Sequence, residues 1–151
     1  MKRFFKLLRD RSGSAAIEFG AIGGLMSVCT LGVVDVGNMV RLSMQANYAA
    51  EAGAGYAFRN GFDATQISTA VTTATRANVV SATPGPSEFY GCATDTAITV
   101  VSNASTPCPN STLNPGLYAM VQAAAIFTPV FNTPLFNYPS SLNATSIVRI
   151  Q

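Results

Sequence analysis

Residues 13–34 read GSAAIEFGAIGGLMSVCTLGVV, and the rest of the chain is organised around this stretch. From Ser14 to Val34 only one residue, Glu18, carries a charge. At the rise of an α-helix these 21 residues would span about 31 Å, which matches the roughly 30 Å hydrocarbon core of a bilayer. The sequence therefore predicts a transmembrane helix over 14–34, with one carboxylate in its first turn.

Charge is distributed unevenly on the two sides of this stretch. Residues 1–12 contain five lysines and arginines and one aspartate, a net charge of +4, whereas the whole chain carries +2. Because basic segments stay on the cytoplasmic side of a membrane, residues 1–13 are expected in the cytoplasm and everything after Val34 outside it. The remaining chain is net negative, so the sequence indicates no basic surface for a nucleic acid.

The composition limits the classes of function. Hydrophobic residues make up 48% of the 151 residues and charged residues only 11%, a balance typical of one modest domain with a membrane anchor. The chain has no histidine, which excludes His-based triads, His general bases and His metal sites. Paired carboxylates, a phosphate-binding loop and a Cys-x-x-Cys site are also missing from the sequence. We therefore expect no enzymatic activity, no catalytic residues, no metal and no cofactor.

A secretory signal peptide also joins a basic N-terminus to an apolar stretch. Its apolar region is usually about 7–15 residues long and is followed by an A-x-A cleavage site. The apolar run here is longer, and no such site follows it. The pattern therefore favours a segment that stays attached to the chain as a single-pass anchor.

The sequence GSAAIEF at 13–19 resembles a type IV prepilin processing site. In that family a membrane-embedded aspartyl peptidase cuts after the glycine and leaves Glu fifth and an aromatic residue sixth in the mature chain. The resemblance implies that residues 1–13 are a leader removed after Gly13. Ser14 then becomes the N-terminus, with Glu18 and Phe19 at the marker positions.

The resemblance also implies a role for Glu18 after cleavage. In pilin-like assemblies the fifth-position Glu is thought to meet the N-terminal amine of a neighbouring subunit, which would neutralise both charges within the bilayer. The alternative is that Glu18 serves only peptidase recognition, or the helix end, where the dipole favours an acid.

Small residues lie one helical turn apart at Ala16, Gly20 and Gly24. A stripe of small residues lets another membrane helix approach closely. The alternative is that glycine is simply frequent in membrane helices.

The apolar pattern continues beyond the predicted membrane segment. No proline occurs before Pro84, and apolar residues recur every four positions on one helical face, at Val36, Val40, Met44, Tyr48 and Ala52. We expect the helix to continue over 35–59 as an amphipathic extension that packs on another part of the protein. Asn60-Gly61 predicts its end, and Asp63 to Gln66 resembles a capping box that opens a second helix over about 64–80.

The composition changes to strand type after Pro84-Gly85-Pro86. Aromatic and β-branched residues predict strands near 88–92, 97–101, 117–127 and 144–150. The aromatic segment 128–141 is expected to fold over the sheet as a loop rather than to form a binding site. We therefore predict an α+β fold with a long N-terminal helix, a second helix and a small antiparallel sheet, in a pilin-like extracytoplasmic domain over 60–151.

Two of the three cysteines fall in the extracytoplasmic part, where oxidation is favoured. Cys92 and Cys108 are therefore expected to form a disulfide. Cys29 lies within the predicted bilayer segment and cannot reach them.

Several features of residues 13–57 occur together in one family: Gly13, Ala15-Ala16, Glu18-Phe19, Gly32, Asp35-Val36-Gly37, and the run AAEAG at 49–53 that closes in Tyr56-Ala57. This region resembles TadE-like proteins, pilin-like components of the tight adherence (Flp) pilus. Many relatives carry a proline in the middle of the span, where this chain has Gly23-Gly24.

The resemblance implies a minor pilin or pseudopilin of the bacterial inner membrane that supports pilus assembly and adhesion. Its expected partners are a prepilin peptidase, other pilin and pseudopilin subunits, the inner-membrane assembly platform and the lipid bilayer. The alternative is a membrane-anchored extracytoplasmic binding or enzymatic domain that uses the helix only as a tether.

Overall fold

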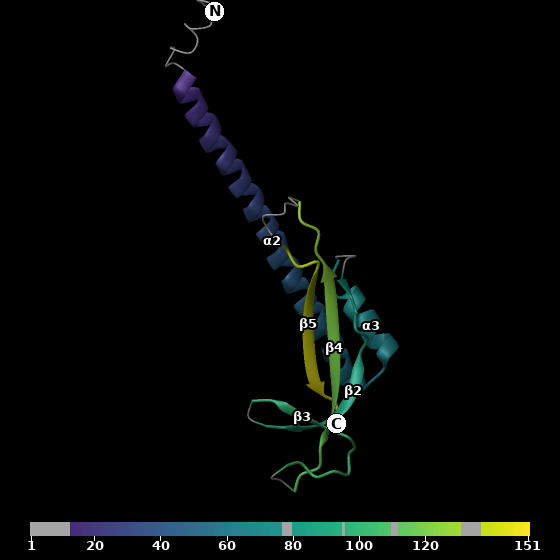
Figure 1. Cartoon of the computed structure of the whole chain (residues 1–151). Helices are drawn as coiled ribbons and strands as arrows, with labels where there is room; N and C mark the ends of the chain where they lie inside the picture. The colour runs from purple at the N-terminus through teal and green to yellow at the C-terminus, as the bar shows by residue number, and fades with distance from the viewer. Residues whose placement is uncertain (1–12, 77–79, 95, 110–111, 131–136) are drawn as a thin grey trace, which may run out of the picture.

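The protein consists of one very long helix with a small α+β body packed along its C-terminal half (Figure 1). The computed structural model describes residues 13–76, 80–94, 96–109, 112–130 and 137–151. The helices are α2 (Ser14–Asn60) and α3 (Ala64–Thr73), and the strands are β1 (Val80–Ser81), β2 (Ser87–Ala93), β3 (Ile98–Val101), β4 (Gly116–Ile126) and β5 (Ser141–Arg149). The predicted α+β fold class is confirmed.

Helix α2 extends without interruption from the predicted membrane segment into the folded body. It ends at Gly61, whose φ of 83° lies in the left-handed region that favours glycine, and whose backbone N–H donates to the Ala57 carbonyl at 2.9 Å. The sequence predicted this end, with the helix over 35–59 and a stop at Asn60-Gly61. In Figure 1 the N-terminal part of α2 projects away from the body, and the buried residues of the helix begin at Asp35.

The sheet is antiparallel throughout and is built around β4. Strand β5 pairs with β4 along one side, while β1 and β2 pair with different parts of β4 on the other, and β3 extends the sheet from β2. The four predicted strands are present within a few residues of their expected bounds. The two-residue strand β1 falls at the end of the region that the sequence assigned to the second helix.

Small side chains form the face of α2 that packs on the sheet. Its buried residues in the folded body are Ala46, Ala49, Ala50, Gly53, Ala54 and Ala57. They face alternate residues of β4, among them Ala119, Val121 and Ala123, all fully buried. Because these side chains are short, the helix axis can lie close to the sheet, and the core is made mostly of alanine and valine.

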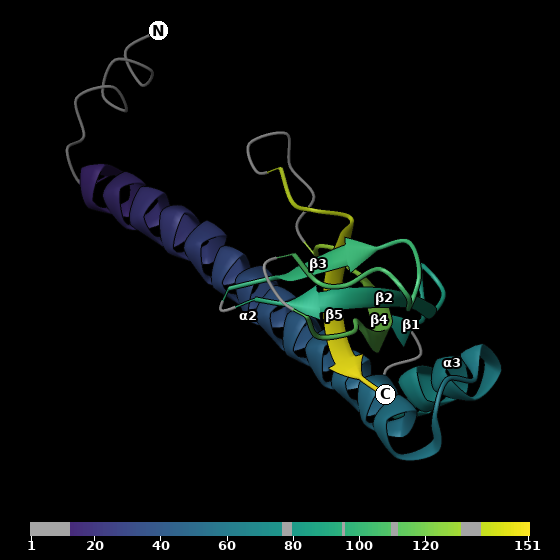
Figure 2. The ribbon, with the colours of Figure 1, turned by 90° about the horizontal axis from the view of Figure 1, so that it is seen from below.

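Helix α3 closes one end of this core beside the C-terminal end of α2 (Figure 2). The Asp63 carboxylate caps it by accepting from the backbone N–H groups of Thr65 and Gln66, each at 3.0 Å, so the predicted start is confirmed. Ile67 and Val71 are fully buried. The predicted extent to about 80 is wrong, since α3 ends at Thr73; its threonine-rich last turn has low helix propensity, and the chain turns there toward β1.

Candidate functional site

The N-terminal half of α2 presents an entirely exposed apolar surface. Among the described residues, α2 is the one helix long and apolar enough to cross a membrane, and none of its most apolar 18-residue window is buried against the body. Ile17 and Phe19 are 74% and 79% exposed. Such a surface is stable only in lipid or against other helices, which indicates a single-pass membrane anchor.

The residues of the predicted processing site lie at the tip of this anchor. Gly13 is the N-cap residue and Ser14 is the first helical residue. The Ser14 hydroxyl donates to Glu18 Oε1 at 3.3 Å, one turn along the exposed helix. Residues 1–12 lie outside the described part of the chain. The structure thus brings Ser14 and Glu18 together, and Phe19 projects outward next to them.

The three small residues predicted to pack against another helix are all exposed. A Cβ atom placed on Gly20 or Gly24 would meet nothing within 4 Å. Together with Ala16 they leave a shallow strip on one side of the anchor. A partner helix could therefore approach the α2 backbone closely along this strip.

Asp35 is a structural residue whose role the sequence analysis did not predict. Its side chain is fully buried, and its Oδ1 atom accepts a hydrogen bond from the backbone N–H of Val130 at 2.7 Å. Val130 belongs to the segment that follows β4, so this contact attaches the body to α2 just beyond the predicted membrane segment. The sequence feature that could have indicated this burial is the helical spacing of Asp35, which places it on the same face of α2 as Leu42, Ala46 and Ala49.

Replacing Asp35 by alanine is expected to lower the free energy of unfolding by about 1–3 kcal/mol, because the Val130 N–H loses its acceptor. Asp35→Asn retains an acceptor oxygen and should lose less. Chemical denaturation of the full-length protein in detergent would measure both. The matched control is Glu51→Ala on the exposed side of α2, expected within about 0.5 kcal/mol of the wild type. Equal stability of Asp35→Ala and this control would contradict the attachment role.

The apolar stripe beyond the membrane segment lies on the opposite side of α2 from the sheet. Val40, Met44 and Tyr48 are 51%, 67% and 61% exposed, and we call these three residues the outer stripe. The extension does pack, as expected, but through its alanine face. The outer stripe therefore continues the exposed apolar surface of the anchor into the region beside the folded body.

The structure contains the expected disulfide between Cys92 and Cys108, with Cα atoms 5.5 Å apart. It ties the segment after β3 to strand β2. Closing a loop of this length contributes about 3 kcal/mol in the chain-entropy model. Cys29 is exposed on the anchor, well apart from this pair in the chain.

The described residues contain no group of three or more Cys, Asp or Glu side chains able to hold a metal ion. Residues 131–136 of the aromatic segment predicted to fold over the sheet lie outside the described residues. At its described edges, Phe127 is buried and its ring stands edge-on to that of Tyr138, with centroids 5.8 Å apart.

The exposed anchor, the outer stripe and Asp35 all lie on the part of the chain that matches a known family. The model of the TadE-like protein family matches residues 13–55. This match confirms the resemblance predicted for the N-terminal region and associates the chain with the Tad pilus, through a structural family of pilus components. No curated protein and no solved structure matches the chain.

Proposed function

We propose that this chain is a minor pilin or pseudopilin of a Tad-type pilus. In this proposal a prepilin peptidase removes residues 1–13, residues 14–34 remain in the inner membrane, and the domain over 60–151 stands in the periplasm or in the filament. The observation that best supports this proposal is the continuity of α2. This single helix joins an exposed apolar anchor to a body that packs against one face of the helix only.

A simple tether would not need this construction, because a flexible linker could leave the membrane and hold a domain at any angle. Here the body is packed along α2 by the alanine face and by the Asp35 to Val130 hydrogen bond. Movement of the anchor is therefore transmitted to the domain. This is the property required of a subunit that an assembly platform lifts out of the membrane into a filament.

Glu18 supplies the proposed registration between subunits. Cleavage after Gly13 would create a positive amine at Ser14, and burying either charge alone in lipid is costly. Within one chain these two residues lie one turn apart on the exposed helix. A neighbour displaced along the axis by about one turn would place its amine beside Glu18, while the Ala16, Gly20 and Gly24 strip allows close contact.

The proposed role is structural, with no catalysis and no cofactor. The family association supports this assignment, since TadE-like proteins are pilus components. Mass spectrometry of purified pili, with this chain counted against the main pilin, would distinguish the candidate positions. A minor pilin would be present at a small fraction of the main pilin, a pseudopilin would stay in the membrane fraction, and a main subunit would dominate.

Processing gives a direct prediction. N-terminal sequencing of the protein from the membrane fraction should begin at Ser14. Gly13→Val should block cleavage, because the peptidase needs access to a backbone without a side chain, whereas Gly32→Ala, farther along the span, should be cut normally. A mature chain that began near Gly37 would mean an ordinary signal peptide, and an intact Met1 would mean a plain anchor.

A further inference from the structure

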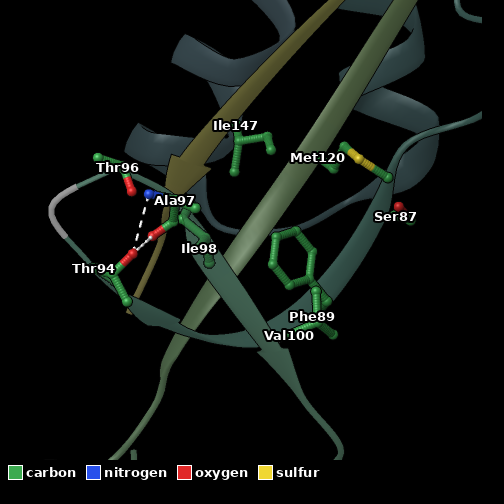
Figure 3. A pocket seen from close by; sticks show the side chains of 10 residues that line it. Ser87, Phe89, Thr94, Thr96, Ala97, Ile98, Val100, Met120 and Ile147 are labelled. Carbon is green, nitrogen blue, oxygen red and sulfur yellow. Dashed lines mark hydrogen bonds between the residues drawn. The ribbon is translucent and has the colours of Figure 1, made fainter. Parts of the chain in front are cut away.

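The face of the sheet that points away from α2 carries an apolar hollow of about 650 Å³ (Figure 3). Phe89 of β2, Met120 of β4 and Ile147 of β5 line it, with Ile98 and Val100 of β3 at its side. Ile147 and Val100 are 44% and 65% exposed, so the hollow opens to the surroundings.

The hydroxyl groups at the rim of the hollow are partly engaged within the β2–β3 hairpin. Thr94 Oγ1 accepts from the Ala97 N–H at 3.1 Å and donates to the Ala97 carbonyl at 2.8 Å. The surface offered to a partner is therefore dominated by aliphatic and aromatic atoms. An apolar surface of this kind marks a contact site.

The outer stripe of α2 is the second uncovered apolar surface. Met44 and Tyr48 each lie two residues from Ala46, about 200° around the helix, so they point directly away from the sheet. The body is a helix layer on a sheet layer, and both of its outward faces are apolar. Two different complementary faces on one molecule are the requirement for a heterologous, head-to-tail contact between copies.

One charged residue lies beside each surface, and the two charges are of opposite sign. Each follows its surface in the direction in which the chain runs. Glu51 follows Tyr48 by one turn on the outward side of α2, and Arg149 follows Ile147 by two residues on the same face of β5. Figure 1 shows α2 and β5 running the same way along the molecule. In two parallel copies, Tyr48 placed beside Ile147 brings Glu51 toward Arg149.

The axial distances agree. Tyr48 to Glu51 rises about 4.5 Å along a helix, and Ile147 to Arg149 rises about 6.6 Å along a strand, a difference that the two long side chains can span. Arg149 donates through Nε to the Gln151 carbonyl at 2.8 Å, and its guanidinium has further N–H donors for a carboxylate.

We propose that the outer stripe of one copy docks in the sheet hollow of a second, parallel copy, with Glu51 of the first paired to Arg149 of the second. This inference deepens the proposed function by naming a contact between subunits, and it takes from that function only the parallel orientation. Repetition of the contact produces an open row of copies rather than a closed dimer.

The contact also fixes an axial step. Val121 lies opposite Gly53, since a Cβ on Gly53 would stand 2.8 Å from Val121 Cγ1. Met120, which lines the hollow, is the residue next to Val121 in β4, so the hollow lies near the level of Gly53 along the helix. The outer residues Met44 and Tyr48 precede Gly53 by nine and five positions. The docked copy is therefore displaced by about 10 Å away from the membrane side.

Cysteine crosslinking of the full-length protein in detergent tests this contact. In detergent no bilayer holds the anchors of the two copies at the same depth, so the axial step between them can form. In a Cys29→Ser background, the pair Tyr48→Cys and Ile147→Cys should give a ladder of dimers, trimers and larger species on oxidation. The matched control pair, Tyr48→Cys and Thr72→Cys, replaces the hollow position by an exposed residue of α3 and should remain mostly monomeric.

Reversing the two charges provides a second test of the contact. Glu51→Arg should reduce the ladder about tenfold, because it places two cations together, and adding Arg149→Glu to it should restore the ladder. Dimers without larger species, a ladder equal to that of the control pair, or no rescue by the double reversal would overturn the proposal. Because no pilus is needed, these results are independent of whether the chain proves to be a pilus subunit.

Discussion

Replacing Glu18 by alanine is expected to leave the chain cleaved and inserted but unable to enter pili. Without the carboxylate, the amine of a neighbouring Ser14 would have to enter the packed membrane segments with no partner for its charge. Leaving one member of a buried ion pair without the other costs about 3–5 kcal/mol, which corresponds to more than a hundredfold loss of association. Electron microscopy and immunoblotting of sheared pili would measure this loss.

Two further substitutions separate charge from shape at this position. Glu18→Gln keeps the size of the side chain but removes the charge, and should fail as Glu18→Ala does. Glu18→Asp keeps the charge and should retain part of the function. If Glu18→Ala strains assembled normal pili containing the variant at the wild-type level, the charge-pairing role would have to be abandoned.

The second large effect is expected at Gly53, where side chains of α3 and β4 pack against α2. A Cβ atom there would lie 2.6 Å from Val71 Cγ2 and 2.8 Å from Val121 Cγ1, both shorter than a normal contact. Overpacking of this kind costs about 1–3 kcal/mol, offset for alanine by about 1 kcal/mol of helix propensity. Gly53→Leu cannot be accommodated and should lower the free energy of unfolding by more than about 3 kcal/mol.

Gly55 provides the matched control on the same helix, because a Cβ there would meet only Arg59 Nη2, at 3.9 Å. Gly55→Leu should therefore keep the folded body, and chemical denaturation in detergent would compare the two leucine variants. If Gly53→Leu were as stable as Gly55→Leu, the close packing of α2 on β4 would not be what holds the body to the helix.

Local signals were sufficient to predict most elements. The apolar run starting at Ser14 and the Asn60-Gly61 stop located α2, Asp63 located the start of α3, and β-branched and aromatic runs located four strands. The end of α3 was missed because the helical spacing that begins at Ile67 and Val71 continues past Thr73, where threonines weaken the helix.

The packing face of α2 could not be predicted from hydropathy alone. Valine, methionine and tyrosine form the stripe of larger apolar side chains, yet alanines and Gly53 face the sheet, because close approach of a helix to a strand is limited by side-chain size. The more apolar residues are thereby left for contacts outside the domain.

For the candidate site, the linear motif indicated Gly13, Ser14, Glu18 and Phe19 as a group, since its members lie within two helical turns. Asp35 could not be assigned in the same way. Its hydrogen-bond donor, Val130, is 95 positions away in the sequence, so only the packing of the body against α2 reveals what the carboxylate does.

The most direct measurement of the central claim is the number of pili on cells from which this chain has been deleted. The account predicts that pili are lost or sharply reduced, and that the wild-type chain restores them while Glu18→Gln does not. A deletion strain with as many pili of the Tad type as its parent would contradict the assignment of this chain as a subunit required for pilus assembly.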